Sequence, residues 1–382
     1  MNALEQQLDY PFGDALPALG TTIEVAPGVH WLRMALPFQL DHINLWLLRD
    51  ELEGVQGWTI VDCGIANDAT RAAWEQIFAN ELQGLPVLRV IVTHMHPDHI
   101  GLAHWLTERW KDGPREVRLW VSATDYNTAR LASSGIAAIG GEATARFMAS
   151  HGLTDAESQA KIKARTNYYA NMVPELPASY RRLLDGDSIS IGSRDWVCHV
   201  GHGHAPEHMS LYCAGDDTPK SPSAPAPQGG APGLPAARRS GGTLISGDMV
   251  LPRISTNVSV HEIEPESNPL ALYLASIKRM KTALPADTLV LPSHGRPFVG
   301  LHTRVDQLVA HHDERFADVL AACAEAPCHA AELLMLLFRR KLDLHQTTFA
   351  MGESVAHLHA LWLSGQLVRR LGADGIYRFS RG

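Results

Sequence analysis

The chain is organised around residues 93–99, which read THMHPDH. They directly follow LRVIV at 88–92, a short, β-branched and almost wholly apolar segment that predicts a strand buried on both faces. Pro97 biases the preceding residues away from helix, so we expect an open loop at the end of this strand. Four of its side chains can bind a metal ion: His94, His96, Asp98 and His99. His94 and His96 should point to the same side of the loop. Asp98 and His99 lie where a helix begins and should point to a second position, so one loop can bind two metal ions.

This run resembles the H-x-H-x-D-H signature of the metallo-β-lactamase superfamily. Segments that resemble the other four motifs of the superfamily occur in the right order, each behind a strand-like run. They are WTIVDCG at 58–64, GHAPEH at 203–208, ISGD at 245–248 and LPSHG at 291–295. The third motif departs from the family pattern, with Ala205 in place of a hydroxyl residue and Glu207 in place of glycine. We expect Glu207 to brace the loop, and neither change removes a ligand.

The resemblance implies a fold and a set of site residues. The fold would be α/β, an αββα sandwich. One metal ion would be held by His94, His96 and His204, the other by Asp98, His99 and His294, with Asp248 bridging. Outside the ligand set, Asp62 would accept a hydrogen bond that orients the ligand loop, and His208 would be a structural partner. Asp98 is also the catalytic candidate, since it can orient the nucleophile and accept its proton.

The ligand chemistry agrees with this assignment. Imidazole and carboxylate without thiolate suit zinc, with iron or manganese as alternatives in a nitrogen/oxygen site. Two ions about 3.5–4 Å apart activate a shared water as hydroxide and polarise a carbonyl or phosphoryl oxygen. We therefore predict a hydrolase with two Zn²⁺ per chain.

The substrate is less constrained. The formal net charge of −8 and a recognition-helix candidate at 352–362 without Lys or Arg disfavour a long polyanion. The apolar loop around Phe38 favours a small molecule with a hydrophobic part, and Arg296 is the nearest candidate for an anionic group. We rank an ester, thioester or lactone first. The alternatives are an endoribonuclease or phosphodiesterase of the same superfamily, a mononuclear iron persulfide dioxygenase, and a nucleic-acid-binding module with a structural metal.

The chain has 382 residues, which exceeds the usual size of one domain. We expect a catalytic domain at 1–304, with a helical insertion at about 123–182 and a disordered, Pro/Ala/Gly/Ser-rich loop at about 216–242. Three helices and a hairpin predicted within 305–382 resemble the winged-helix domain of a superfamily branch that includes an endoribonuclease. Packing or formation of a homodimer is its favoured role, while nucleic-acid binding is left open.

The composition bears on location. The five cysteines have no CxxC spacing and predict neither a disulfide framework nor a thiolate zinc site. The N-terminus lacks the pattern of a secretory signal, and no apolar run approaches the ~20 residues that span a bilayer. We expect a cytoplasmic protein without a membrane partner.

Overall fold

The computed structural model describes residues 3–38, 40–135, 141–215 and 241–382. Seven strands form the first sheet, and their order in the sheet is their order in the chain. They are β1 (Ile23–Ala26), β2 (Val29–Ala35), β3 (His42–Leu52), β4 (Val55–Val61), β5 (Val87–Ile91), β6 (Leu119–Ser122) and β7 (Tyr180–Leu183). Strands β1 to β4 pair antiparallel, whereas β4 to β7 pair parallel. All five residues of β5 are buried, as its continuous apolar run predicts.

The second sheet has six strands in the order β13-β12-β11-β10-β9-β8. They are β8 (Ser188–Ile191), β9 (Arg194–Gly201), β10 (His208–Cys213), β11 (Thr243–Gly247), β12 (Leu289–Pro292) and β13 (Phe298–Val299). Strands β11 and β12 pair parallel, and the other neighbours pair antiparallel. The two sheets face each other across one apolar cluster that includes Trp31, Trp46 and Trp196.

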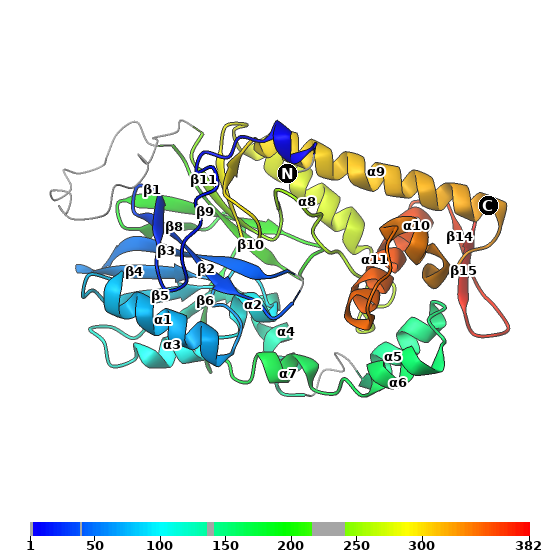
Figure 1. The fold of residues 1–382 in the computed structure, drawn as a ribbon, viewed down its shortest axis with the longest axis horizontal. Helices are drawn as coiled ribbons and strands as arrows, with labels where there is room; N and C mark the ends of the chain where they lie inside the picture. The colour runs from blue at the N-terminus through cyan, green and yellow to red at the C-terminus, as the bar shows by residue number, and fades with distance from the viewer. Residues whose placement is uncertain (1–2, 39, 136–140, 216–240) are drawn as a thin grey trace.

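Helices cover the outer faces of both sheets, which gives the expected αββα layers (Figure 1). The first sheet carries α1 (Asp68–Asn80), α2 (Pro97–Ile100), α3 (Ala103–Arg109) and α4 (Ala123–Ser133), and the second carries α8 (Pro269–Ala283) and the start of α9 (Leu301–Glu325). α1 begins where the side chain of Asn67 accepts a hydrogen bond from the backbone N–H of Thr70. It buries Trp74 and Ile77 against the sheet.

The region expected to be a helical insertion, 123–182, is divided between three parts of the fold. α4 packs on the first sheet and belongs to the sandwich. α5 (Gly141–Ser150) and α6 (Ala156–Lys163) pack instead against the C-terminal helices. The last residues form β7, an edge strand that the prediction missed. α6 and α7 (Tyr168–Met172) are separate helices, since Asn167 has a φ of 57° and does not belong to a right-handed helix.

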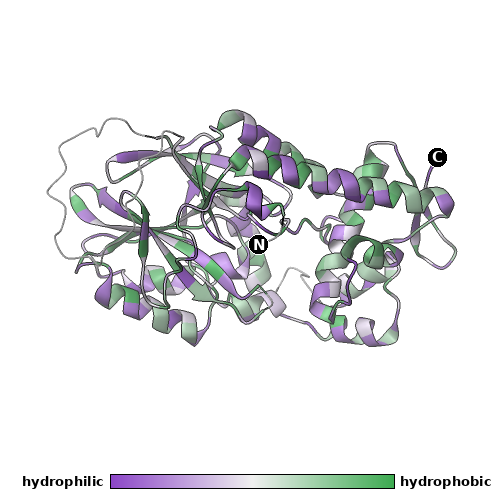
Figure 2. Ribbon diagram, turned by 45° about the horizontal axis from the view of Figure 1, so that its top comes forward, coloured by the Kyte–Doolittle hydropathy of each residue, from purple (hydrophilic) through white to green (hydrophobic). Residues whose placement is uncertain are grey.

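The C-terminal segment, residues 305–382, shares a hydrophobic cluster with the sandwich. α9 runs without a break from the second sheet to the far end of the molecule, so the boundary expected at 304/305 lies in its first turn (Figure 1). Polar and apolar residues alternate along α9 (Figure 2), and its apolar residues join one cluster with β12 and the last long helix. The remaining elements are η2 (Ala330–Leu333), α10 (Leu334–Phe338), α11 (Leu344–Leu363), β14 (Val368–Leu371) and β15 (Tyr377–Ser380). Their order is helices followed by a hairpin, and winged-helix membership stays a prediction.

The low-complexity tract predicted to be disordered at 216–242 lies outside the described residues, apart from Gly241 and Gly242, which are buried. In the part of the chain that the structure describes, no helix is long and apolar enough to cross a membrane.

Candidate metal centre

One edge of the sandwich gathers all the segments that carry predicted ligands. His94 and His96 follow β5, His204 follows β9, Asp248 follows β11, and His294 follows β12. The sheets deliver these loops to a common point although up to about 200 residues separate them in the chain. Their side chains form two adjacent groups of ligand atoms: His94, His96, His204 and Asp248, and then Asp98, His99 and His294. The structure thus brings together the seven side chains that the resemblance implied.

In the first group, three imidazole nitrogens form a tight triangle. Nε2 of His94 lies 2.8 Å from Nδ1 of His96 and 3.1 Å from Nε2 of His204, and the latter two atoms are also 3.1 Å apart. Nitrogens held at about 2.0 Å from one tetrahedral zinc ion would be about 3.3 Å apart. The triangle therefore has nearly the size of one face of such a coordination shell.

The second group shares the Asp248 carboxylate with the first. Oδ2 of Asp248 lies 3.3 Å from Nε2 of His204, while its Oδ1 lies 3.4 Å from Nε2 of His294 and 3.6 Å from Nε2 of His99. Asp98 closes this group, with Oδ2 3.5 Å from Nε2 of His294. One carboxylate thus presents an oxygen to each group, which is the arrangement of a bridging ligand.

The hydrogen bonds of three histidines turn their Nε2 atoms towards the centre. Nδ1 of His204 donates to the carbonyl of Asn257, and Nδ1 of His294 donates to the carbonyl of His42, both at 2.8 Å. Nδ1 of His99 donates to Asp62 at 2.8 Å. In each ring Nε2 therefore points inward, and it offers a lone pair once the ring is neutral. Two atoms that face the centre, Nε2 of His99 and Oδ1 of Asp248, are buried and have no hydrogen-bond partner among the described residues. A divalent ion would satisfy both, so the residues present fit a metal site.

The charges of the centre are also suited to a cation. Burial and the neighbouring imidazoles lower the pKa of His94 and of His96, which keeps both rings neutral. Burial alone would lower the pKa of His99, but the carboxylates of Asp62, Asp98 and Asp248 raise it well above its ordinary value. A cation is therefore favoured at this end of the centre, and metal binding there would displace a proton.

Asp62 is the residue that holds the ligand loop, in the position that the resemblance implied. Its Oδ1 accepts the backbone N–H of Thr93 at 2.8 Å, and its Oδ2 accepts the hydroxyl of the same residue at 2.9 Å. Because its other partner is His99, one buried carboxylate fixes both the start of the loop and a candidate ligand.

His208 contacts the Asp248 loop. Its Nε2 accepts the backbone N–H of Asp248 at 3.1 Å, and burial lowers its pKa to about 3, so the ring is neutral. Gly247 lies against the same ring, with a φ of 53°, and a Cβ there would come within 2.2 Å of Nε2. Glycine is therefore required beside His208.

Asp125 is a supporting residue that the sequence reasoning missed. This buried side chain on α4 accepts the backbone N–H of Met95 at 2.9 Å and that of Glu207 at 2.7 Å. It thereby connects the loop that carries His94 with the loop that carries His204. Glu207 itself braces the second loop, as expected, since its carboxylate accepts from the backbone and hydroxyl of Thr124.

The two predicted substrate contacts have different surroundings. Phe38 stacks on His345 of α11, with ring centroids 5.6 Å apart, and His345 also contacts Tyr168 and Phe349. Arg296 instead lies over the ring of Tyr10 and forms an ion pair with Asp14 at 2.5 Å. Its charge is paired with the exposed Asp14 of the N-terminal arm, and the role of Arg296 in binding an anionic group stays a prediction.

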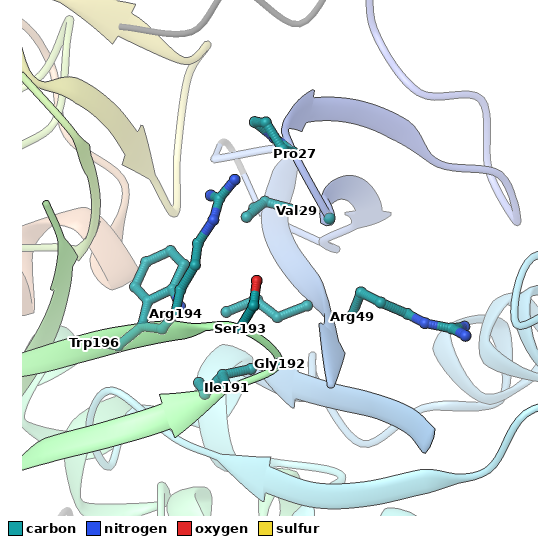
Figure 3. A pocket seen from close by; sticks show the side chains of 10 residues that line it. Pro27, Val29, Arg49, Ile191, Gly192, Ser193, Arg194 and Trp196 are labelled. Carbon is teal, nitrogen blue, oxygen red and sulfur yellow. The ribbon is translucent and has the colours of Figure 1, made fainter. Parts of the chain in front are cut away.

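Figure 3 shows a separate pocket. It is about 200 Å³ in volume and is lined by the turns between β1 and β2 and between β8 and β9. Arg194 borders it, whereas the guanidinium of Arg49 extends away from it. β9 begins at Arg194 and ends at Gly201, about 23 Å further along the strand, and His204 follows that opposite end. The pocket is therefore distinct from the metal centre.

Comparisons with known proteins agree with the fold. Residues 39–218 match the model of the metallo-β-lactamase superfamily, and residues 316–382 match that of a metallo-β-lactamase-like C-terminal domain. A β-lactamase domain protein from Burkholderia ambifaria is 53% identical over the whole of both chains, with a TM-score of 0.87. A metallo-β-lactamase family protein from Thermus thermophilus is 26% identical with a TM-score of 0.71, covering 94% of this chain and all of that one. A probable metallo-hydrolase from Bacillus subtilis is 21% identical, covering 86% of this chain and 91% of the relative.

Two layers of sheet between helices, with a paired His/Asp cluster at one edge, define a metallo-hydrolase of the αββα type. The chain belongs to the metallo-β-lactamase superfamily.

Proposed function

We propose that the chain is a hydrolase that binds two divalent metal ions, with zinc favoured, and cleaves an ester, a thioester or a lactone. The observation that carries the proposal is the pair of adjacent ligand groups sharing Asp248. His94, His96 and His204 would hold one ion, and Asp98, His99 and His294 the other. When bound, such ions lower the pKa of a water towards neutrality and polarise the substrate oxygen.

The protein's own residues supply position and proton transfer. Asp98 is partly exposed, with 19% of its side chain accessible, whereas the His99 side chain beside it is fully buried. Asp98 can therefore meet a water entering from solvent, accept a hydrogen bond that orients it, and take up its proton. Asp62 keeps the ring of His99 turned inward, so that its Nε2 stays available for the metal ion.

An apolar substrate group is supported by aromatic contacts on segments that also hold the ligand loops. Phe38 lies on the loop that leads to His42, whose carbonyl anchors His294. On α7, Tyr168 precedes Tyr169, whose hydroxyl donates to the carbonyl of Met95 in the ligand loop. Rings from these two segments meet at His345 of α11. They form an aromatic cluster on segments that also anchor the ligand loops, which suits an apolar substrate group.

A polyanionic substrate is less well supported. Several arginines of the C-terminal segment are engaged by carboxylates: Arg339 with Asp318, Arg369 with Glu266, and Arg378 with Asp374. Counterion release requires cations that are free to meet phosphates, so these pairs weaken the case for RNA cleavage. An endoribonuclease or phosphodiesterase of the same superfamily is therefore the second candidate.

The test is a parallel assay of metal content and activity. We expect about two equivalents of metal per chain and hydrolysis of p-nitrophenyl esters, acyl thioesters or lactones that disappears in Asp98→Ala. Cleavage of single-stranded RNA or bis-p-nitrophenyl phosphate alone would move the assignment to the second candidate. One equivalent of iron with oxygen uptake on a persulfide would replace the hydrolase by a dioxygenase.

A further inference from the structure

We propose that Glu353, on α11 of the C-terminal segment, is a positioning residue for His204. The C-terminal segment would then be part of the metal centre and not a separate appendage. The inference rests on the proposed ligand role of His204 and adds a residue that lies outside the superfamily's five motifs.

A short chain of hydrogen bonds connects the two residues. Nδ1 of His204 donates to the backbone carbonyl of Asn257 at 2.8 Å. The side chain of Asn257 donates from Nδ2 to Oε2 of Glu353 at 3.3 Å. A single residue, Asn257, thus holds His204 with its backbone and Glu353 with its side chain. This is the only hydrogen bond of the Glu353 carboxylate given by the described residues, and it ties the loop at 256–260 to α11.

The orientation of the Asn257 amide is determined at both ends. Its Oδ1 accepts the hydroxyl of Ser259 at 2.8 Å, which leaves Nδ2 to donate to Glu353. The loop also approaches the helix backbone closely, since the N–H of Val260 donates to the carbonyl of Gly352 at 3.2 Å. A Cβ on Gly352 would come within 2.6 Å of Cβ and Oγ of Ser259. The absence of a side chain at 352 therefore allows this contact.

α11 is fixed firmly enough to serve as a support. The hydroxyl of Ser354 donates to the carbonyl of Ala330 at 2.9 Å. Nδ1 of His357 donates to the carbonyl of Glu353 at 2.8 Å, and its Nε2 accepts from Nδ1 of His312 on α9 at 3.2 Å. His312 and His357 are both buried. The Glu353 carboxylate consequently projects from a helix that is hydrogen-bonded to both η2 and α9.

The consequence concerns the ring of one ligand. A hydrogen bond from Nδ1 to a fixed carbonyl selects the tautomer of a metal-binding histidine and the direction of its ring. If Glu353 is lost, Nδ2 of Asn257 loses its acceptor, and the loop that carries the carbonyl can move. Outer hydrogen-bond partners of this kind change metal affinity or activity by about 10–100-fold.

The experiment is a Co²⁺ titration of the full-length, metal-free protein, followed by its visible absorption and by competition with a chelator. In Glu353→Ala we expect one of the two Co²⁺ equivalents to bind about 10–100-fold more weakly, with a changed absorption band, while the other is unchanged. Glu353→Gln should restore binding, because its amide oxygen can still accept from Asn257. Glu325→Ala, which removes an exposed carboxylate at the end of α9, is the matched control and should behave as wild type.

Gly352→Ala gives a second perturbation that leaves the carboxylate in place. We expect it to weaken the same Co²⁺ equivalent, because the added methyl group pushes the loop away. If Glu353→Ala and Gly352→Ala are folded by circular dichroism and bind both equivalents with wild-type affinity and spectra, the inference is refuted. If the wild-type protein itself binds fewer than two equivalents, the proposed two-metal function fails instead.

Discussion

Asp125→Asn is the change whose effect can be worked out most directly. Each carboxylate oxygen of Asp125 accepts one backbone N–H, from Met95 and from Glu207. Asparagine has the same shape but only one oxygen, so in either orientation its NH₂ faces one of these two donors. One hydrogen bond to a charged acceptor is lost, at roughly 1.5–3 kcal/mol, and a buried N–H is left without a partner. Since about 1.4 kcal/mol corresponds to tenfold, metal affinity should fall by roughly 10–150-fold if this energy is lost only in the metal-bound form.

The assay is Zn²⁺ competition against a chromophoric chelator, with urea unfolding of the metal-free protein measured alongside. Glu207→Gln is the matched control, because it weakens an exposed contact of the same brace and should change affinity by less than about fivefold. Wild-type Zn²⁺ affinity in folded Asp125→Asn would show that the two loops hold their positions without this carboxylate.

Three further outcomes are expected. Asp50→Ala should lower the free energy of unfolding by about 3–5 kcal/mol in urea, because it leaves the buried guanidinium of Arg89 without its bidentate partner; a loss below about 1 kcal/mol would contradict this. Burial lowers the pKa of His357 to about 4 and that of His312 to about 2, so the folded state keeps both rings neutral. Stability should be complete above pH 6.5 and fall as the pH drops towards 4, by roughly 3 kcal/mol from His357 alone, and His357→Gln should flatten this dependence in urea titrations. Phe38→Ala should raise KM for long-chain esters several-fold more than for acetate esters, with kcat little changed; an equal rise in KM for both would contradict a contact between Phe38 and the apolar part of the substrate.

Those parts of the site in which candidate ligands directly follow apolar strands could be predicted from the sequence. The ligand loop after β5 is one case: a buried strand followed by alternating histidines can be read locally, and the structure places His94 and His96 side by side. The layers of the sandwich could be predicted for the same reason, since its central strands are continuous apolar runs.

Other features could not be predicted because their partners are distant in the chain. Asp125 acts on residues 30 and 82 positions away, and nothing in its own surroundings marks it. β7 contains two adjacent arginines and β8 alternates exposed and buried residues, which is typical of edge strands and resembles loop sequence. The interruption between α6 and α7 includes one residue in the left-handed conformation, Asn167, and helical periodicity in the sequence does not reveal such a residue.

The contact between α11 and the 256–260 loop also has a consequence for the order in which the protein is made. Glu353 leaves the ribosome 96 residues after Asn257, which at about 5–20 residues per second takes roughly 5–20 s. During that interval Val258 and Val260 lack the part of their cluster that α11 supplies, which includes Met351 and Val355. A nascent chain that pauses in this window exposes apolar surface that α11 covers in the finished fold, so its protection from aggregation depends on completing this helix.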